Sequence, residues 1–333
     1  MKEKHLARKY TSGGGSERIE TLPKEVSPIT SPLPLVSVVI ATRDRPEMLR
    51  EAVDAVLSQD YSGPIETIVV FDQSEPDKGI EREGDHRSVR VTTNSRKVGL
   101  AGARNSGIRS SAGEYIAFCD DDDYWLPGRL SAQIAAISAW PDASLATTGI
   151  RVQYDGETFD RTLDAELVPM TALLRDRHTQ LHPSTFLLRR SLLDAVGLVD
   201  EQVPGGFGED YEFLLRHAKL HPIVNVAAPL VVVRWGKQSF FFRRWETMAA
   251  GLTWLLRRYP EFEASRRGSA RVRGQIAFAH AAMGNRRRAV RWAASSWRRN
   301  PLELRAPLTV AVAVGLVRPD RVMEFLHNRG RGI

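Results

Sequence analysis

Apolar residues recur in a strand-like pattern four times within the first 120 positions of this 333-residue chain. The first run, 35–41, is nearly continuous and rich in β-branched residues, which is typical of a strand buried on both faces of a parallel sheet. Similar runs follow at 65–71, 88–92 and 114–119. Between the first two, apolar residues fall at helical spacing behind Pro46, so this region predicts a right-handed strand–helix–strand unit.

Strands and helices keep alternating to about residue 235. The remaining strand patterns are 144–154, 182–190 and 223–233, and Asp155–Gly156 has the composition of a hairpin turn. The helices between them are predicted to begin behind a proline, a serine cap or a glycine-rich loop, near Pro127, Ser191 and residue 209. Several strands end on polar or acidic residues, as expected where an open α/β sheet binds a ligand at the carboxyl ends of its strands.

The chain beyond residue 240 has a wholly helical, arginine-rich pattern. Within it, 276–297 predicts two antiparallel helices that resemble a single tetratricopeptide-like hairpin. The first 34 residues contain three consecutive glycines and scattered charge without apolar periodicity. We therefore expect a disordered leader at 1–34, an α/β domain with a mixed, mostly parallel sheet at 35–238, and a helical domain at 239–333.

Charge is distributed unevenly along the chain. From Arg234 to the end there are 21 Lys and Arg against 6 Asp and Glu, whereas the first 233 residues carry 26 against 34. The net charge of +7 therefore combines an acidic body with a basic C-terminal third. Three interpretations of the basic helices stay open: peripheral contact with an anionic membrane, nucleic-acid binding, and a solvated face of a homodimerisation domain. Nucleic acid is disfavoured because no DNA- or RNA-binding signature accompanies the charge.

Cysteine content and hydropathy predict a cytoplasmic protein. The single cysteine, Cys119, excludes an intramolecular disulfide, and its place in an apolar strand predicts a small buried side chain. The first thirty residues lack the apolar run of a secretory signal. The longest apolar run, 308–317, is about ten residues, short of the roughly 20 that a membrane-spanning helix needs. Peripheral attachment at the inner face of a membrane stays compatible with the basic helices.

Four consecutive carboxylates, Asp120 to Asp123, follow the strand at 114–119. Adjacent carboxylates repel one another, and packing alone gives no reason for them. A hard divalent cation such as Mg²⁺ or Mn²⁺ prefers oxygen ligands and would neutralise them. The alternative is a solvated acidic turn ahead of the helix that begins near Pro127.

Two common nucleotide-binding classes lack their signatures in this chain. No Gly-x-Gly-x-x-Gly follows a predicted strand, and no Walker lysine motif occurs. A nicotinamide dehydrogenase and a P-loop enzyme are therefore disfavoured.

Five motifs, in order, carry a resemblance to a known family. They are Val36-Ser-Val-Val-Ile-Ala-Thr, Asp72-Gln-Ser, Asn94…Gly99…Ala103-Arg-Asn-Ser-Gly, Phe118-Cys-Asp-Asp-Asp-Asp-Tyr-Trp-Leu-Pro and Gly208-Glu-Asp-Tyr-Glu-Phe. Together, over about residues 35 to 235, they resemble glycosyltransferase family 2, the inverting nucleotide-sugar transferases of GT-A fold. The resemblance implies a Rossmann-like GT-A sheet flanked by helices, a nucleoside diphosphate sugar as donor, and a hydroxyl-bearing acceptor, for which a lipid-linked molecule is one candidate.

The aspartate run matches the family's Asp-x-Asp motif. By that match Asp122 is the implied direct ligand of Mg²⁺ or Mn²⁺ together with Asp120, while Asp120 or Asp121 would face the ribose or the sugar. Four adjacent aspartates leave this register open by one residue. A divalent ion here would neutralise the charge of the departing diphosphate without a proton transfer.

Residues at the neighbouring strand ends are implied to bind the nucleotide sugar. Asp72 matches the aspartate that accepts a hydrogen bond from the nucleobase. Arg43 stands where the family often has an aromatic residue that stacks on the base, and this departure leaves the identity of the base open. The other implied nucleotide-sugar ligands are Thr42, Asp44, Gly99, Arg104 and Asn105. For Asp44, an N-cap role ahead of Pro46 is an equal alternative.

Asp210 is the implied catalytic base, with Glu209 beside it as an assisting group. An inverting transfer is one in-line displacement, in which the acceptor hydroxyl loses its proton as it attacks. Glycines 205, 206 and 208 would let this loop become ordered after the donor has bound. The alternative is that both acids only stabilise the N-terminus of the following helix.

Two further residues are candidates for the acceptor side of the site. His182 lies where related enzymes place acceptor-side or metal-adjacent groups, and Trp235 could stack on a sugar face. A structural role is the alternative for both.

The favoured hypothesis is a metal-dependent inverting glycosyltransferase that acts in making a cell-envelope polysaccharide, a glycolipid or a glycosylated metabolite. A nucleotidyltransferase is the first alternative, but the loop at 42–46 is not the glycine- and lysine-rich loop of such enzymes. A non-catalytic nucleotide-sugar-binding scaffold is the second, and the presence of both the aspartate run and Asp210 argues against it.

Overall fold

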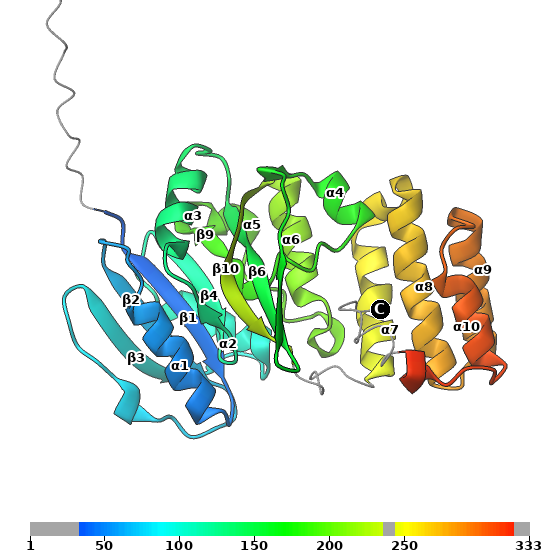
Figure 1. The fold of residues 1–333 in the computed structure, drawn as a ribbon, viewed down its shortest axis with the longest axis horizontal. Helices are drawn as coiled ribbons and strands as arrows, with labels where there is room; N and C mark the ends of the chain where they lie inside the picture. The colour runs from blue at the N-terminus through cyan, green and yellow to red at the C-terminus, as the bar shows by residue number, and fades with distance from the viewer. Residues whose placement is uncertain (1–32, 236–243, 323–333) are drawn as a thin grey trace, which may run out of the picture. The chain divides into compact units, whose positions relative to one another are not determined.

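A ten-stranded mixed sheet organises the structure, a computed structural model that describes residues 33–235 and 244–322 (Figure 1). The strand order is β3-β2-β1-β4-β9-β6-β10-β5, with β7 beside β6 and β8 beside β10. The strands are β1 (Val36–Thr42), β2 (Ile65–Phe71), β3 (Arg87–Thr93), β4 (Tyr115–Asp120), β5 (Tyr124–Trp125), β6 (Leu145–Tyr154), β7 (Glu157–Arg161), β8 (Leu167–Val168), β9 (Leu187–Arg189) and β10 (Ile223–Arg234).

The first four strands pair in parallel, as the apolar runs predict. Side chains of β1 alternate between two cores: Val36, Val38 and Ile40 pack on one face of the sheet, and Val39 and Ala41 on the other. This double burial explains the nearly continuous apolar sequence. Because the strands are parallel, the loops after β1, β2 and β4 leave the sheet at the same edge.

The second half of the sheet is mixed. Strand β9 pairs antiparallel with β4 and β6, while β6 pairs in parallel with β10. The strand expected at 182–190 is shorter than predicted, because Pro183–Thr185 forms a 3-10 turn and Pro183 has no N–H for a ladder. The hairpin turn is confirmed, with φ of 51° at Asp155 and 84° at Gly156 between β6 and β7.

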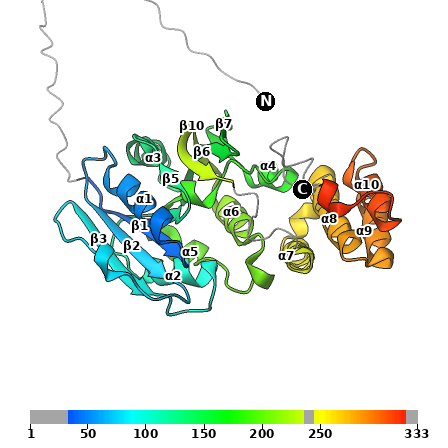
Figure 2. The ribbon, with the colours of Figure 1, turned by 60° about the horizontal axis from the view of Figure 1, so that its bottom comes forward.

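Helices cover both faces of the sheet (Figure 2). Apolar residues of α1 and α3 contribute to one core, and those of α2 and α6 to the other. The bounds are α1 (Pro46–Leu57), α2 (Leu100–Ser110), α3 (Arg129–Ser138), α4 (Met170–Arg175), α5 (Leu193–Val196) and α6 (Glu209–Leu220). Cys119 is a free, buried thiol, as its place in an apolar strand predicts. Burial raises its pKa well above the ordinary value.

Of three local expectations about helix starts, two need correction and one is confirmed. The N-cap of α1 is Arg45, so the alternative role of Asp44 as that cap is wrong. The helix expected near Pro127 is confirmed: it begins at Arg129, directly after Gly128, which adopts a left-handed conformation. The helix after Ser191 is a single turn that starts with Leu193 and has no side-chain cap.

Beyond the sheet, the described part of the chain forms α7 (Trp245–Arg258), α8 (Arg266–Ala282), α9 (Arg286–Arg299) and α10 (Arg305–Ala313). The predicted helical pair corresponds to α8 and α9, which pack through Ala277 and Ala293. Apolar residues of α7 and α8 join the core on the α6 face of the sheet. The approach of α8 requires Gly268, since a Cβ there would lie 1.7 Å from the carbonyl oxygen of Leu174.

The predicted domain boundaries stay predictions. The leader at 1–34 lies almost entirely outside the described residues, and the boundary at 238/239 falls in the gap between the two described ranges. Among the described residues, no helix combines the length and the apolar character needed to cross a bilayer.

Candidate active site

The aspartate run that ends β4 divides into two pairs with different partners. The first pair, Asp121 and Asp122, faces the loop after β1, which leaves the sheet at the same edge. Thr42 Oγ1 donates to Asp121 Oδ2 at 2.8 Å. Arg45 Nη1 lies 3.0 Å from Asp121 Oδ1 and 2.7 Å from Asp122 Oδ2. Asp121 and Asp122 thus share one cationic partner.

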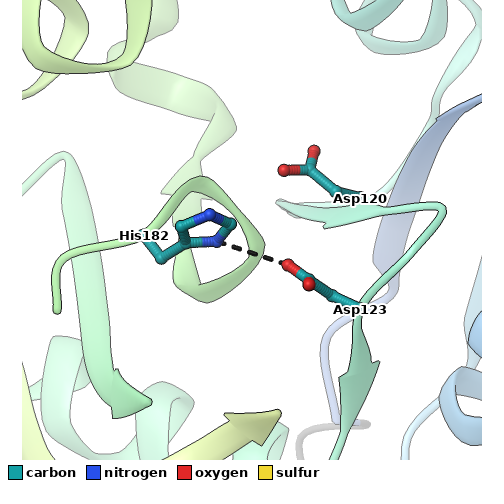
Figure 3. Close-up of side chains that lie close together, drawn as sticks. All are labelled: Asp120, Asp123 and His182. Atoms are coloured by element: carbon teal, nitrogen blue, oxygen red, sulfur yellow. Dashed lines mark ion pairs between the residues drawn. The ribbon is translucent and has the colours of Figure 1, made fainter. Parts of the chain in front are cut away.

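The second pair, Asp120 and Asp123, lies next to His182 (Figure 3). One ligand atom from each of these three residues falls within 4.8 Å of the other two. His182 Nδ1 is 3.3 Å from Asp123 Oδ2, and Ser184 Oγ donates to the same oxygen at 2.5 Å. His182 and Ser184 belong to the turn before β9, which the antiparallel pairing of β9 with β4 brings to this edge.

Burial raises the pKa of three of the four carboxylates in the aspartate run. Burial raises the pKa of Asp121, and burial together with Asp120 raises that of Asp122. The pKa of Asp123 rises well above its ordinary value, because the residue is 2% exposed and Asp120 and Asp122 repel its charge. Asp120 differs: burial opposes its ionisation, but the positive charges of Arg104, His182 and Arg45 together outweigh burial and lower its pKa.

The donor set of Asp120, Asp123 and His182 fits a divalent cation. Carboxylates suit Mg²⁺ and Mn²⁺, and imidazole is a common ligand of transition metals. A cation here would also offset the charge of Asp123, whose ionic partner among the described residues is His182. Asp122, the ligand implied by the family motif, is bound to Arg45 instead, so the two ligand sets share Asp120.

Arg104 connects the end of β4 to the start of α6. Its side chain is 3% exposed, with Nη2 at 2.6 Å from Asp120 Oδ1 and Nη1 at 3.2 Å from Glu209 Oε1. The guanidinium also lies over the Phe118 ring, 5.4 Å from its centroid. We expected Arg104 near the ribose and phosphates, and the structure shows its guanidinium engaged by two carboxylates. We define the carboxylate cluster as Asp120–Asp123, Arg104, His182, Glu209 and Asp210.

The two acids that begin α6 have opposite pKa shifts. Burial raises the pKa of Glu209 to about 7 against the opposing effect of Arg104. Burial also disfavours the charge of Asp210, but the Arg177 guanidinium and a 2.7 Å hydrogen bond from the Tyr211 backbone N–H outweigh it and lower the pKa. Asp210 is therefore ionised at neutral pH, as a proton acceptor must be.

The predicted nucleobase residue Asp72 connects two of the five sequence motifs. Its Oδ1 accepts from Asn94 Nδ2 at 2.8 Å, and its Oδ2 accepts from the Gly99 backbone N–H at 3.0 Å. Arg43, next to this group, is exposed and donates to Gln73 Oε1 at 2.9 Å. The ends of β2 and β3 and the start of α2 therefore meet at Asp72.

Three other predicted site residues have partners that do not belong to the carboxylate cluster. Asp44 is exposed, with φ of 55°. Asn105 is 1% exposed, and its side chain is hydrogen-bonded to the backbone of Val199 and to the carboxylate of Glu201. Trp235 packs against β7, where Arg161 lies 4.5 Å from its ring centroid, a geometry that favours the packing alternative. Their binding roles stay predictions.

Sequence reasoning missed three residues that organise this region. Arg45 lies in the charged loop after β1, so its sequence position offered a signal. Ser184 follows His182 by two positions, and the signal there was the histidine–proline pair. Arg177, the partner of Asp210, comes from the segment after α4, where no sequence pattern indicates a functional residue.

One segment of this chain is similar to a known protein family. Residues 37–197 match the family described as glycosyl transferase family 2. This segment, just under half of the chain, belongs to glycosyltransferase family 2. The uncharacterized glycosyltransferase YwdF of Bacillus subtilis is 27% identical over 205 residues, which cover 59% of this chain and 73% of that protein. WfaP of Escherichia coli, a UDP-Glc:α-D-GlcNAc-diphosphoundecaprenol β-1,3-glucosyltransferase, is 39% identical over 102 residues, 30% of this chain and 40% of WfaP.

Solved structures show the same fold. Residues 1–349 of Staphylococcus aureus TarS in complex with UDP-GlcNAc align with a TM-score of 0.58 at 15% identity, covering 89% of this glycosyltransferase and 92% of that chain. The mannosyltransferase PcManGT from Pyrobaculum calidifontis, in complex with GDP-Man and Mn²⁺, aligns with a TM-score of 0.53 at 18% identity, covering 91% and 86%. The expected GT-A class, with helices beyond the sheet, is thus confirmed.

Family membership makes the protein an enzyme that transfers glycosyl groups, which excludes the non-catalytic scaffold. The match to the family ends at residue 197, ahead of Glu209 and Asp210. The roles of these two acids therefore depend on the geometry of the carboxylate cluster.

Proposed function

We propose that this glycosyltransferase moves a sugar from a nucleoside diphosphate donor to a hydroxyl acceptor with inversion, using a divalent cation and Asp210 as general base. One observation carries the proposal. Arg104 bonds both Asp120, at the end of β4, and Glu209, next to the ionised Asp210. A donor held along the strand ends would thereby face a proton acceptor.

The donor side rests on Asp72 and the segments that meet there. The base and ribose would lie at the ends of β1 and β2, between Arg43 and Asp72, with Gly99 close by. The names of similar proteins support a nucleotide sugar: WfaP uses UDP-Glc, TarS was solved with UDP-GlcNAc, and PcManGT with GDP-Man. Both uracil and guanine occur among these donors, so the base stays open here.

Asp210 would accept the proton of the acceptor hydroxyl. As the acceptor oxygen attacks the anomeric carbon, the bond from that carbon to the diphosphate breaks and the proton passes to Asp210 Oδ. The lowered pKa of Asp210 keeps it ionised before the reaction, and the raised pKa of Glu209 suits that residue to a hydrogen bond with the acceptor or donor. Arg177 holds the Asp210 carboxylate in position.

The aspartate run with His182 would hold the cation. When bound, the ion would stabilise the charge that develops on the departing diphosphate. The family motif assigns the ligands as Asp120 and Asp122, whereas the geometry brings together Asp120, Asp123 and His182. In the first assignment Asp122 must exchange Arg45 for the ion, and in the second Asp123 gains a charge that balances its own.

A lipid-linked or polysaccharide acceptor is the class that the relatives favour, since the name of WfaP specifies a diphosphoundecaprenol acceptor. The basic surface of the C-terminal helices would suit such an acceptor at an anionic membrane.

A thermal-shift screen of nucleotide sugars tests the proposal. With Mn²⁺ present, the cognate donor should raise the melting temperature by mass action, and omission of Mn²⁺ should reduce that shift. Product analysis with the donor so identified should give the anomer opposite to that of the donor. Retention of the anomeric configuration, or release of pyrophosphate from a nucleoside triphosphate and a sugar phosphate, would contradict it.

A further inference from the structure

A cavity of about 670 Å³ opens among the C-terminal helices. Its walls come from α7, α8 and α9, with Pro204 from the loop before α6, and none of the carboxylate-cluster residues lines it. Two tryptophans, three arginines and a histidine give it its chemical character: Trp254, Trp292, Arg257, Arg288, Arg291 and His280. We call it the tryptophan–arginine cavity.

The arginines of this cavity are exposed and unneutralised. Arg257, Arg288 and Arg291 make no ion pair or hydrogen bond with any residue that the structure describes, and Glu246 is the only carboxylate in the lining. Arg104 and Arg177 of the active-site region, in contrast, each have a carboxylate partner. Three positive charges around one concavity therefore create a field that attracts an anion.

The inner part of the cavity is aromatic and partly apolar. Trp254 and Trp292 are half-buried and pack against the core on the α6 face of the sheet. A ligand with one flat apolar face would therefore pack against these two rings.

The cavity is in contact with the loop that leads to Asp210. Helix α7 packs directly on that loop: a Cβ at Gly251 would lie 2.5 Å from the carbonyl oxygen of Phe207. Pro204, at the start of the same loop, is part of the cavity wall. A molecule bound in the cavity would therefore touch the segment that carries the two acids of α6.

We propose that the tryptophan–arginine cavity binds a phosphorylated sugar unit, the anionic part of a glycan acceptor whose reactive end reaches Asp210. Arginine pairs bidentately with phosphate, and tryptophan stacks on the apolar face of a sugar ring. The volume matches a site for one small ligand, for which roughly 300–1,000 Å³ is usual. An extended acidic peptide would not use an enclosed aromatic wall. The assignment to an acceptor rests on the proposed function, whereas the binding itself does not.

Isothermal titration of the full chain tests the site, with α-D-glucose 1-phosphate, glucose and inorganic phosphate as probes. We expect glucose 1-phosphate to bind at least tenfold more tightly than glucose or inorganic phosphate, because only it engages both the rings and the arginines. The double variant Arg288→Ala/Arg291→Ala should weaken its binding at least tenfold. Arg298→Ala, an exposed arginine on the same helix α9 but outside the cavity, should leave it within about twofold.

Three results would overturn the site. One is equal weakening by the double variant and by Arg298→Ala, which would indicate a diffuse charge effect. A second is a preference for inorganic phosphate over the sugar phosphate. The third is binding to vesicles of phosphatidylglycerol without binding to glucose 1-phosphate, which would make this face a membrane contact. Donor hydrolysis separates the two proposals: it should be unchanged in the double variant, and its absence in the wild type would count against the proposed function while leaving the sugar-phosphate site in place.

Discussion

The carboxylate cluster and the tryptophan–arginine cavity handle charge in opposite ways. In the cluster, the acids at the end of β4 and the start of α6 are buried or half-buried and are partly neutralised by Arg104, Arg45 and Arg177. In the cavity, exposed arginines have no such partners among the described residues. Buried charges are held in fixed positions by hydrogen bonds and respond strongly to any substitution, whereas exposed charges attract a ligand and tolerate change. The first arrangement suits bond-making chemistry, and the second suits binding.

Replacing Asp210 should produce the largest effect. In Asp210→Asn the acceptor proton has no base, so kcat should fall by about 10³-fold, while the donor dissociation constant changes less than about threefold. Kinetics with the cognate donor and direct donor titration measure the two quantities. Glu209→Gln is the matched control, with an expected loss of only about tenfold. A loss below tenfold in Asp210→Asn would remove the main distinction between the cluster and the cavity.

Acid should lower the free energy of unfolding through His217, which is buried in the last turn of α6. Burial and Arg216 lower its pKa to about 3, and its Nδ1 bonds Ser144 Oγ at 2.7 Å. Because the folded-state pKa is below the unfolded value, this stability is present above pH 6.5 and is lost as pH falls toward 3. The free energy of unfolding should drop by about 2 kcal/mol between pH 6.5 and pH 5.

Urea unfolding at those two pH values checks the effect of His217. His217→Gln should remove most of the pH dependence. His280→Gln, which alters the half-buried ring in the cavity, should remove less of it. The reverse order of these two variants would show that the cavity, and not the α6 face of the sheet, contains the acid-sensitive histidine.

Arg177→Ala should have the smallest of the three effects, about a tenfold loss of kcat on the acid side of the pH optimum. Arg177 lowers the pKa of Asp210, so its removal raises that pKa and shifts the acid limb of the pH–rate profile to higher pH. Arg177→Lys should restore most of the profile. An unshifted acid limb in Arg177→Ala would mean that this residue supports the fold without acting on Asp210.

Local patterns in the sequence predicted much of the fold. The nearly continuous run of β1, the hairpin at Asp155–Gly156 and the arginine-rich helices were all readable, because each depends on neighbouring residues. The strand at 182–190 was overestimated, since composition does not reveal that residues 183–185 turn before β9 begins.

The arrangement of the candidate site was less predictable. The aspartate run was evident, but its division was not, because Thr42 and Ser184 bond Asp121 and Asp123 from 79 and 61 positions away. Arg177 was missed for the same reason, being 33 positions from Asp210. The cavity was out of reach as well, since helical periodicity does not show which arginines lack partners.

The central claim is that the aspartate run holds the divalent cation on which transfer depends. Titration of Mn²⁺ into the wild type and into Asp120→Asn, each saturated with the cognate nucleoside diphosphate, tests this claim most directly. Electron paramagnetic resonance of the free ion should show a single tight Mn²⁺ site that weakens at least tenfold in Asp120→Asn. Asp122→Asn and Asp123→Asn, measured in the same way, should identify the second carboxylate ligand by which of them weakens the site. Equal Mn²⁺ affinity in wild type and Asp120→Asn, or full transferase activity in the presence of EDTA, would contradict the claim.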